Sequence, residues 1–140
     1  MVELINGLIK TRETVLISLC LLGIPCRYHG EKYRMGHRIG RPKLINKIMD
    51  KYNIMPLCGE QLGGLPTPRP PCKVSGDRVV SKDETQDYTS EYTKGAVQIL
   101  ECCQHHNVQR AYLLKNSPMC GRDGILGKLL KENGITVFSI

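Results

Sequence analysis

Three cysteines stand at the ends of three separate apolar runs. Cys20 ends a run of aliphatic residues, Cys58 directly follows residues 54–57, and Cys120 closes the turn after a third run. Thiolates are soft ligands that suit zinc, copper and iron–sulfur clusters. If the fold brings these thiols together, we expect a metal centre.

The number and spacing of these cysteines favour an open site. Three thiolates are one ligand short of a closed tetrahedral zinc site, and the Cys-x-x-Cys pairs typical of structural zinc do not occur in the sequence. Three cysteines suit a [4Fe–4S] cluster with one iron left open to solvent or substrate. Such an iron is a Lewis acid that binds soft sulfur. The alternative is that the cysteines bind no metal.

Two residues near these cysteines are candidates for acid–base chemistry. Glu60, two residues after Cys58, is a candidate general base or proton shuttle, and Ser117, three residues before Cys120, is a candidate to orient substrate or water. The alternative treats Glu60 as a loop carboxylate and the Ser117 segment as an ordinary turn. The glycines and prolines of residues 63–71 predict a stiff, extended loop after Glu60.

The remaining cysteines and the histidines carry weaker signals. Cys26, six residues after Cys20, either belongs to the same site or is a small buried side chain, and Cys72 is a candidate exposed thiol. Core packing is expected for Cys103, and its neighbour Cys102 cannot share that helical face. Loop solvation, or the preference of a helix C-terminus for histidine, is sufficient to account for His29, His37, His105 and His106.

The cysteines need a scaffold, and the hydrophobic pattern predicts alternating strands and helices. Runs of aliphatic and β-branched residues without alternation indicate strands buried on both faces. Apolar residues on one helical face indicate helices between them. The expected strands are 14–20, 54–58, 111–115 and 135–139, and the expected helices are 42–52, from Asp87 or Thr89 to about His106, and from a cap at Asp123 to Gly134.

Strands that alternate with helices predict a single α/β domain over residues 1–140, with a small, Rossmann-like parallel sheet of about four strands and helices on its faces. Ligands of such sheets bind at the carboxyl ends of the strands. Cys20, Cys58 and Cys120 all fall at carboxyl ends, so they should converge on one edge. Elsewhere we expect a short leading helix from the spacing of Leu4, Ile5, Leu8 and Ile9, a loop over 23–41 and a hairpin over 74–80.

Composition narrows the class of protein. The chain of 140 residues is 41% hydrophobic but has no Trp and one Phe, so its core must be aliphatic. The run 15–24 is short, lacks a cleavage site and leads into a basic loop, so we reject a signal peptide. Nothing approaches the roughly 20 apolar residues of a membrane span. Seven cysteines without a disulfide-scaffold spacing then indicate a cytoplasmic protein whose thiols are reduced or metal-bound.

The net charge of +7 is partly local. Six basic residues fall within residues 27–43, and the only aromatic residues among them are Tyr28 and Tyr33. Recognition of single-stranded nucleic acid usually needs more stacking aromatics. We therefore expect a solvated loop with an anion-facing edge and consider a nucleic-acid partner unlikely. The six residues are Arg27, Lys32, Arg34, Arg38, Arg41 and Lys43.

Taken together, three ordered motifs resemble the 2-thiouracil desulfidase family, formerly a family of unknown function. They are Cys20-Leu-Leu-Gly-Ile-Pro-Cys-Arg-Tyr28, Cys58-Gly-Glu-Gln-Leu-Gly-Gly-Leu-Pro-Thr-Pro-Arg69 and Ser117-Pro-Met-Cys-Gly121. The resemblance implies that Cys20, Cys58 and Cys120 hold a [4Fe–4S] cluster whose open iron takes a thiocarbonyl sulfur, with Glu60 and Ser117 assisting attack on the carbon. The implied substrate is a small thiolated heterocycle.

Three features depart from the family pattern. Gly59 stands where a proline is usual, His29 stands where an acidic residue is common, and residues 122–124 replace a longer glycine-rich loop. If that loop closes over the substrate in the family, we expect a more open site and another substrate here. The rival interpretations are a non-catalytic iron–sulfur or zinc-binding sensor or structural module, and an RNA-associated basic protein.

Overall fold

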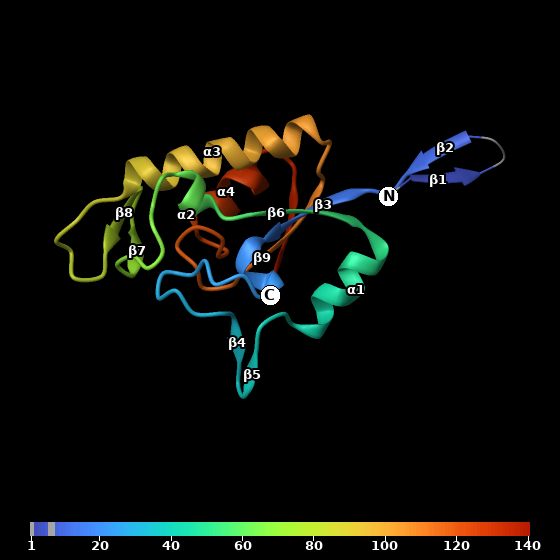
Figure 1. Cartoon of the computed structure of the whole chain (residues 1–140). Helices are drawn as coiled ribbons and strands as arrows, with labels where there is room; N and C mark the ends of the chain where they lie inside the picture. Colours follow the sequence, from blue (N-terminus) through green and yellow to red (C-terminus); the bar gives the residue numbers. More distant parts are fainter. Residues whose placement is uncertain (1, 6–7) are drawn as a thin grey trace.

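The computed structural model describes residues 2–5 and 8–140, and its centre is a parallel β-sheet (Figure 1). Within these residues the sheet has four strands, and all neighbouring strands are parallel. The order across the sheet is β6 (Asn53–Leu57), β3 (Thr14–Ser18), β9 (Arg110–Leu113) and β10 (Thr136–Ser139). The predicted α/β fold class is therefore confirmed.

The connections between the strands place helices on both faces of the sheet. The chain moves from β3 through α1 (Lys43–Lys51) to β6, and then back across β3 through α3 (Thr89–His105) to β9. Right-handed crossovers in opposite directions put α1 on one face and α3, with α4 (Ile125–Glu132), on the other (Figure 1). Because the chain leaves β3 and β9 toward opposite sides, their carboxyl ends form a switch point, where such sheets bind ligands.

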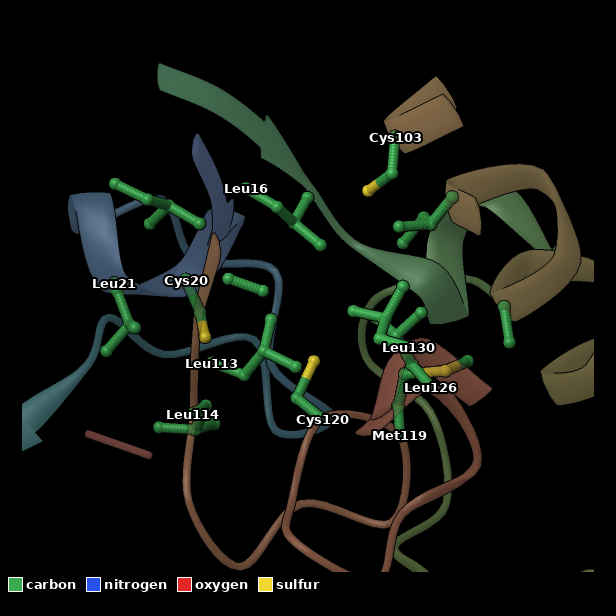
Figure 2. Packing of buried hydrophobic residues seen from close by; sticks show 14 of the residues in the cluster. Leu16, Cys20, Leu21, Cys103, Leu113, Leu114, Met119, Cys120, Leu126 and Leu130 are labelled. Atoms are coloured by element: carbon green, nitrogen blue, oxygen red, sulfur yellow. The ribbon is translucent and has the colours of Figure 1, made fainter. Parts of the chain in front are cut away.

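The core is aliphatic, as the composition predicts, and it extends up to the carboxyl edge of the sheet. Val15, Leu16 and Ile17 of β3 are completely buried. The buried residues of α3 are Tyr92, Gly95, Ala96, Ile99 and Cys103, whose spacing places them on one face of the helix, and Leu100 is partly buried beside them. Figure 2 shows that this packing continues past Leu113 to the side chains of Cys20 and Cys120.

The first residues form a hairpin, so the expected leading helix is wrong. β1 (Val2–Ile5) pairs antiparallel with β2 (Leu8–Thr11), with Ile5 opposite Leu8. The sequence between these strands is Asn-Gly, the strongest short hairpin signal, and it outweighs the helical spacing of the apolar residues. Residues 1, 6 and 7 lie outside the described part.

Two hairpins and the start residues of two helices differ slightly from the predictions. The predicted loop 23–41 contains a small hairpin, β4 (Arg34–Met35) with β5 (Arg38–Ile39). The hairpin predicted over 74–80 is present as β7 (Cys72–Ser75) with β8 (Arg78–Ser81). Pro42 is the N-cap of α1 rather than its first residue, and Gly124, not Asp123, is the N-cap of α4. Asp87 does accept a hydrogen bond from the Thr89 N–H at the start of α3.

In the described part of the chain, no helix combines the length and the apolar character needed to cross a bilayer. A single domain over residues 1–140 and a cytoplasmic location remain predictions.

Candidate metal centre and active site

A cavity of about 320 Å³ opens at the carboxyl edge of the sheet, between the ends of β3, β6 and β9. The five predicted site residues all line it: Cys20, Cys58, Glu60, Ser117 and Cys120. The structure thus brings together the whole predicted set from three distant parts of the chain. The assignment of roles within the set remains a proposal.

Cys20 is positioned by an abrupt turn after β3. The strand ends at Ser18, and one turn of 3₁₀ helix, η1 (Leu19–Leu22), carries the cysteine at the cavity wall. Gly23 then adopts a φ of 88°, which side chains rarely tolerate, and its N–H donates to the Cys20 carbonyl at 3.1 Å. The chain can therefore leave the turn without continuing as a helix.

Cys58 and Glu60 are positioned by the short helix α2 (Gly59–Leu62), which packs closely on α3. This close approach depends on glycines, because a β-carbon at Gly63 would overlap the carbonyl of Glu91 on α3. A β-carbon at Gly59 would stand 2.8 Å from the sulfur of Met119. Contact with the α3 backbone on one side and with the Met119 side chain on the other thus fixes the depth at which Cys58 enters the cavity.

Cys120 lies in a turn that Ser117 stabilises. The Ser117 Oγ accepts hydrogen bonds from the N–H groups of Met119, at 3.1 Å, and Cys120, at 3.0 Å. The first N–H groups of α4 in turn donate to carbonyls of this turn, with Ile125 N–H donating to Pro118 at 3.0 Å. The cysteine therefore sits on a turn that also caps the following helix.

The thiols of the cavity contact one another, and Cys26 is among them. Cys26 is 2% exposed, and its thiol hydrogen-bonds with those of Cys20 and Cys58. The contact with Cys20 raises the pKa of Cys26 to about 11, and the contact with Cys26, followed by burial, raises the pKa of Cys58 as well. Of the two alternatives for Cys26, the structure therefore supports a place in the site.

Ser18 is a site residue that sequence reasoning missed. Its hydroxyl oxygen accepts a hydrogen bond from the Leu114 N–H at 2.9 Å, which links the ends of β3 and β9. Burial raises the pKa of the Cys120 thiol to about 12, and hydrogen bonds from the hydroxyls of Ser18 and Ser117 oppose that rise. A polar residue at the end of an otherwise apolar strand was the only available signal.

Arg69 is the second residue that sequence reasoning missed. Glu60 is only 8% exposed, and Nη2 of the buried Arg69 donates a hydrogen bond to its Oε2. An unpaired buried carboxylate is costly, so this partner explains why Glu60 is tolerated there. The guanidinium thus places a positive charge beside the carboxylate at the cavity wall.

Of the three remaining cysteines, one lines the cavity and two do not. Cys72 is 8% exposed and lines the cavity wall, so its expected exposure is wrong: β7 carries it inward beside Tyr92. Cys103 is completely buried, as predicted, while Cys102 is half-buried on α3, and neither lines the cavity.

The four histidines also lie outside the cavity lining. Arg27 and Arg34 of the basic loop line it, whereas the other four basic residues of the loop do not.

The donor set fits an iron–sulfur cluster better than a single ion. Among the residues that the structure describes, no three His, Cys, Asp or Glu side chains are arranged to hold one metal ion. A cluster is larger than an ion, so its thiolate ligands must surround a space rather than meet at a point. Cys20, Cys58 and Cys120 line such a space, and Cys26 lines it beside them.

Cysteine thiols, a buried carboxylate and a hydroxyl at the carboxyl edge of a parallel sheet define an enzyme-like α/β protein with a cysteine-rich site. The chain belongs to the 2-thiouracil desulfurase family, whose profile matches residues 15–139. This confirms the predicted family and its enzymatic character.

Two similar proteins bear on this membership. A solved structure described as the [4Fe-4S]-dependent thiouracil desulfidase TudS is 31% identical, covers 91% of each chain and superposes with a TM-score of 0.81. The uncharacterized protein YbbK of Bacillus subtilis strain 168 is 30% identical over 136 residues, 87% of this chain and 85% of its own length.

Proposed function

We propose that this protein is a [4Fe–4S]-dependent desulfidase that removes sulfur from a thiolated pyrimidine such as 2-thiouracil, giving uracil and sulfide. The observation that carries the proposal is the meeting of Cys20, Cys58 and Cys120 with Glu60 and Ser117 in one cavity. Membership of the desulfurase family and the likeness to a cluster-dependent thiouracil desulfidase support it.

In this proposal the three cysteines hold the cluster. When bound, the cluster supplies an iron without a protein ligand, a Lewis acid with affinity for the thiocarbonyl sulfur. The role of the protein is to place the substrate carbon and a water molecule beside each other. The cavity, enclosed by loops from three strands, is large enough for a small heterocycle.

Glu60 takes the proton that the attacking water must lose. Overall, the oxygen of water replaces sulfur on the carbon, and both protons of water leave with the sulfide, so no oxidant or reductant is needed. A general base near the attacked carbon typically contributes about 10²–10⁴-fold to the rate. Arg69 occupies Oε2 of Glu60 and leaves Oε1 without a protein donor among the described residues, in contact with solvent.

Ser117 can act only as a hydrogen-bond donor. A serine oxygen has two lone pairs, and two backbone N–H groups occupy both of them here. The hydroxyl hydrogen is then free for the Cys120 sulfur, for water or for an acceptor on the substrate. This limits Ser117 to orienting these groups and excludes it as a base in this conformation.

The test is a product assay on cluster-loaded protein. Anaerobically reconstituted protein, freed of reductant, is incubated with 2-thiouracil, and uracil and sulfide are quantified. Equal amounts of both products, formed over many turnovers, support the proposal. A protein that holds iron and sulfide but turns over no thiolated pyrimidine would instead favour the non-catalytic module.

A further inference from the structure

The Arg69 side chain hydrogen-bonds with several parts of the site besides its ion-pair partner Glu60. This side chain is 3% exposed and lines the wall of the cavity beside Glu60. Nη1 donates to Thr67 Oγ1 at 3.0 Å and to the Pro66 carbonyl at 3.3 Å, within its own proline-rich segment. Nη2 donates to the Cys26 carbonyl at 2.9 Å and to Oε2 of Glu60.

These contacts use all four terminal N–H groups of the guanidinium. Only the Nε–H remains, and within the described residues it is buried without a partner. The terminal groups cannot bind an anionic substrate unless a bond to Glu60, to Cys26 or to the proline-rich segment breaks. The contacts therefore identify Arg69 as a residue that acts through its neighbours rather than on a ligand.

The backbone of Arg69 also connects the Cys26 loop to the proline-rich segment. Its N–H donates to the Tyr28 carbonyl at 2.7 Å, two residues from the Cys26 carbonyl that its side chain holds. The loop after Cys20 is thus tied to the proline-rich segment by main chain and side chain together. Three segments meet at one guanidinium: the Cys26 loop, the Glu60 helix and residues 66–69.

We propose that Arg69 is a positioning residue: it holds Glu60 by one carboxylate oxygen, so that the other faces the cavity, and it locks the Cys26 loop against α2. This deepens the function proposed above. Lysine cannot replace it, because an ammonium group is a point donor that cannot span four acceptors on three segments. The planar fork of arginine fits this arrangement.

The experiment compares R69Q, R69K, E60Q and the E60Q/R69Q double variant as cluster-loaded proteins, with R110Q as the matched control. Arg110 also pairs with a glutamate, Glu13, but at the surface. Two quantities are measured: kcat for 2-thiouracil, and the rate at which iodoacetamide alkylates Cys26, followed by mass spectrometry with buried Cys103 as internal reference.

If Arg69 acts through Glu60, R69Q should lower kcat by about 10²–10³-fold with little change in KM, and the double variant should be no slower than E60Q. Cys26 should react roughly tenfold faster in R69Q and in R69K, because the loop opens more readily. E60Q should keep Cys26 protected, since the Gln oxygen still accepts from Arg69. R110Q should match the wild type in both measurements.

Two results would overturn the inference. One is an R69Q protein with wild-type kcat and wild-type Cys26 reactivity; the other is a double variant slowed by the full product of the single effects. If the wild type turns over no thiolated pyrimidine, the proposed function fails, but Cys26 reactivity and a double-mutant cycle on the unfolding midpoint still test Arg69. If R69Q does not fold, R69K carries the same comparison.

Discussion

Gly95 of α3 lies so close to the carbonyl oxygen of Gly59, at the start of α2, that a β-carbon at position 95 would overlap that oxygen. The Gly59 carbonyl already accepts a hydrogen bond from the Gly63 N–H at 2.9 Å, so it cannot move without loosening α2. The distance between the two helices is thus set by backbone contact, and α2 carries Glu60 directly after Cys58.

Gly95→Ala should therefore destabilise the protein, although alanine normally favours a helix over glycine by about 1 kcal/mol. Overpacking of this kind costs about 1–3 kcal/mol and should push α2, with Cys58, away from the cavity. We expect a lower denaturant midpoint and less bound iron. Val97→Ala, at a 40% exposed position of the same helix, is the control. A Gly95→Ala protein as stable as the wild type would show that α2 is free to shift.

The ligand set is tested by single cysteine substitutions. Cys20→Ala, Cys58→Ala and Cys120→Ala should each abolish the brown chromophore and the bound iron and sulfide, because three thiolates are the minimum for the proposed cluster. Substitutions of Cys72, Cys102 and Cys103 should leave both. Iron and sulfide analysis with the visible spectrum measures the result, and a cluster retained in any of the first three variants removes that residue from the set.

The acid–base assignment predicts unequal effects at Glu60 and Ser117. Glu60→Gln should keep iron and sulfide but lower desulfuration of 2-thiouracil by about 10²–10⁴-fold, because the amide cannot accept the proton. Ser117→Ala should cost less activity, since a water can replace one hydroxyl donor. It should also lower stability by roughly 1–3 kcal/mol, because two N–H groups lose their acceptor. Exposed Glu31 supplies the control, Glu31→Gln, and full activity of Glu60→Gln would defeat the assigned role.

Binding of RNA separates the desulfidase from the RNA-associated alternative. Only Arg27 and Arg34 of the basic loop line the cavity, and the loop offers few aromatic rings for stacking. Short single-stranded RNA should therefore bind non-specifically, with a dissociation constant of about 10⁻⁴–10⁻⁶ M at physiological salt and a steep loss of affinity as salt rises. Fluorescence anisotropy of a labelled oligonucleotide measures it, and a submicromolar constant would favour the alternative.

The parts that the sequence predicted well depend on local pattern. The apolar run of β3 marks a strand buried on both faces, and the rule that parallel strands meet at their carboxyl ends then brings Cys20, Cys58 and Cys120 together. No information on long-range contacts was needed for this step. The predicted leading helix is wrong because the spacing of Leu4, Ile5, Leu8 and Ile9 also suits two short strands, and the Asn-Gly sequence between them is a hairpin signal.

The supporting contacts could not be predicted, because they join residues far apart in the chain. Arg69 reaches the Cys26 carbonyl over a separation of 43 residues, and Ser18 accepts from Leu114 over 96. Neither residue type signals its partner: an arginine among prolines and a serine at a strand end each have many common roles. Only the packing of the finished fold decides which acceptor a buried donor meets.

The position of β3 between β6 and β9 has a consequence for how the protein matures. β6 and β9 do not pair with each other, so the strands that lead to Cys58 and Cys120 are brought side by side by their common pairing with β3. A nascent chain that has not yet produced β9 can hold the first two thiols but has no third wall for the cavity. Pairings between strands so distant in sequence are slow to form. Under the proposed function, we therefore expect a cluster to be inserted only after β9 has paired with β3, into a protein that is already nearly folded.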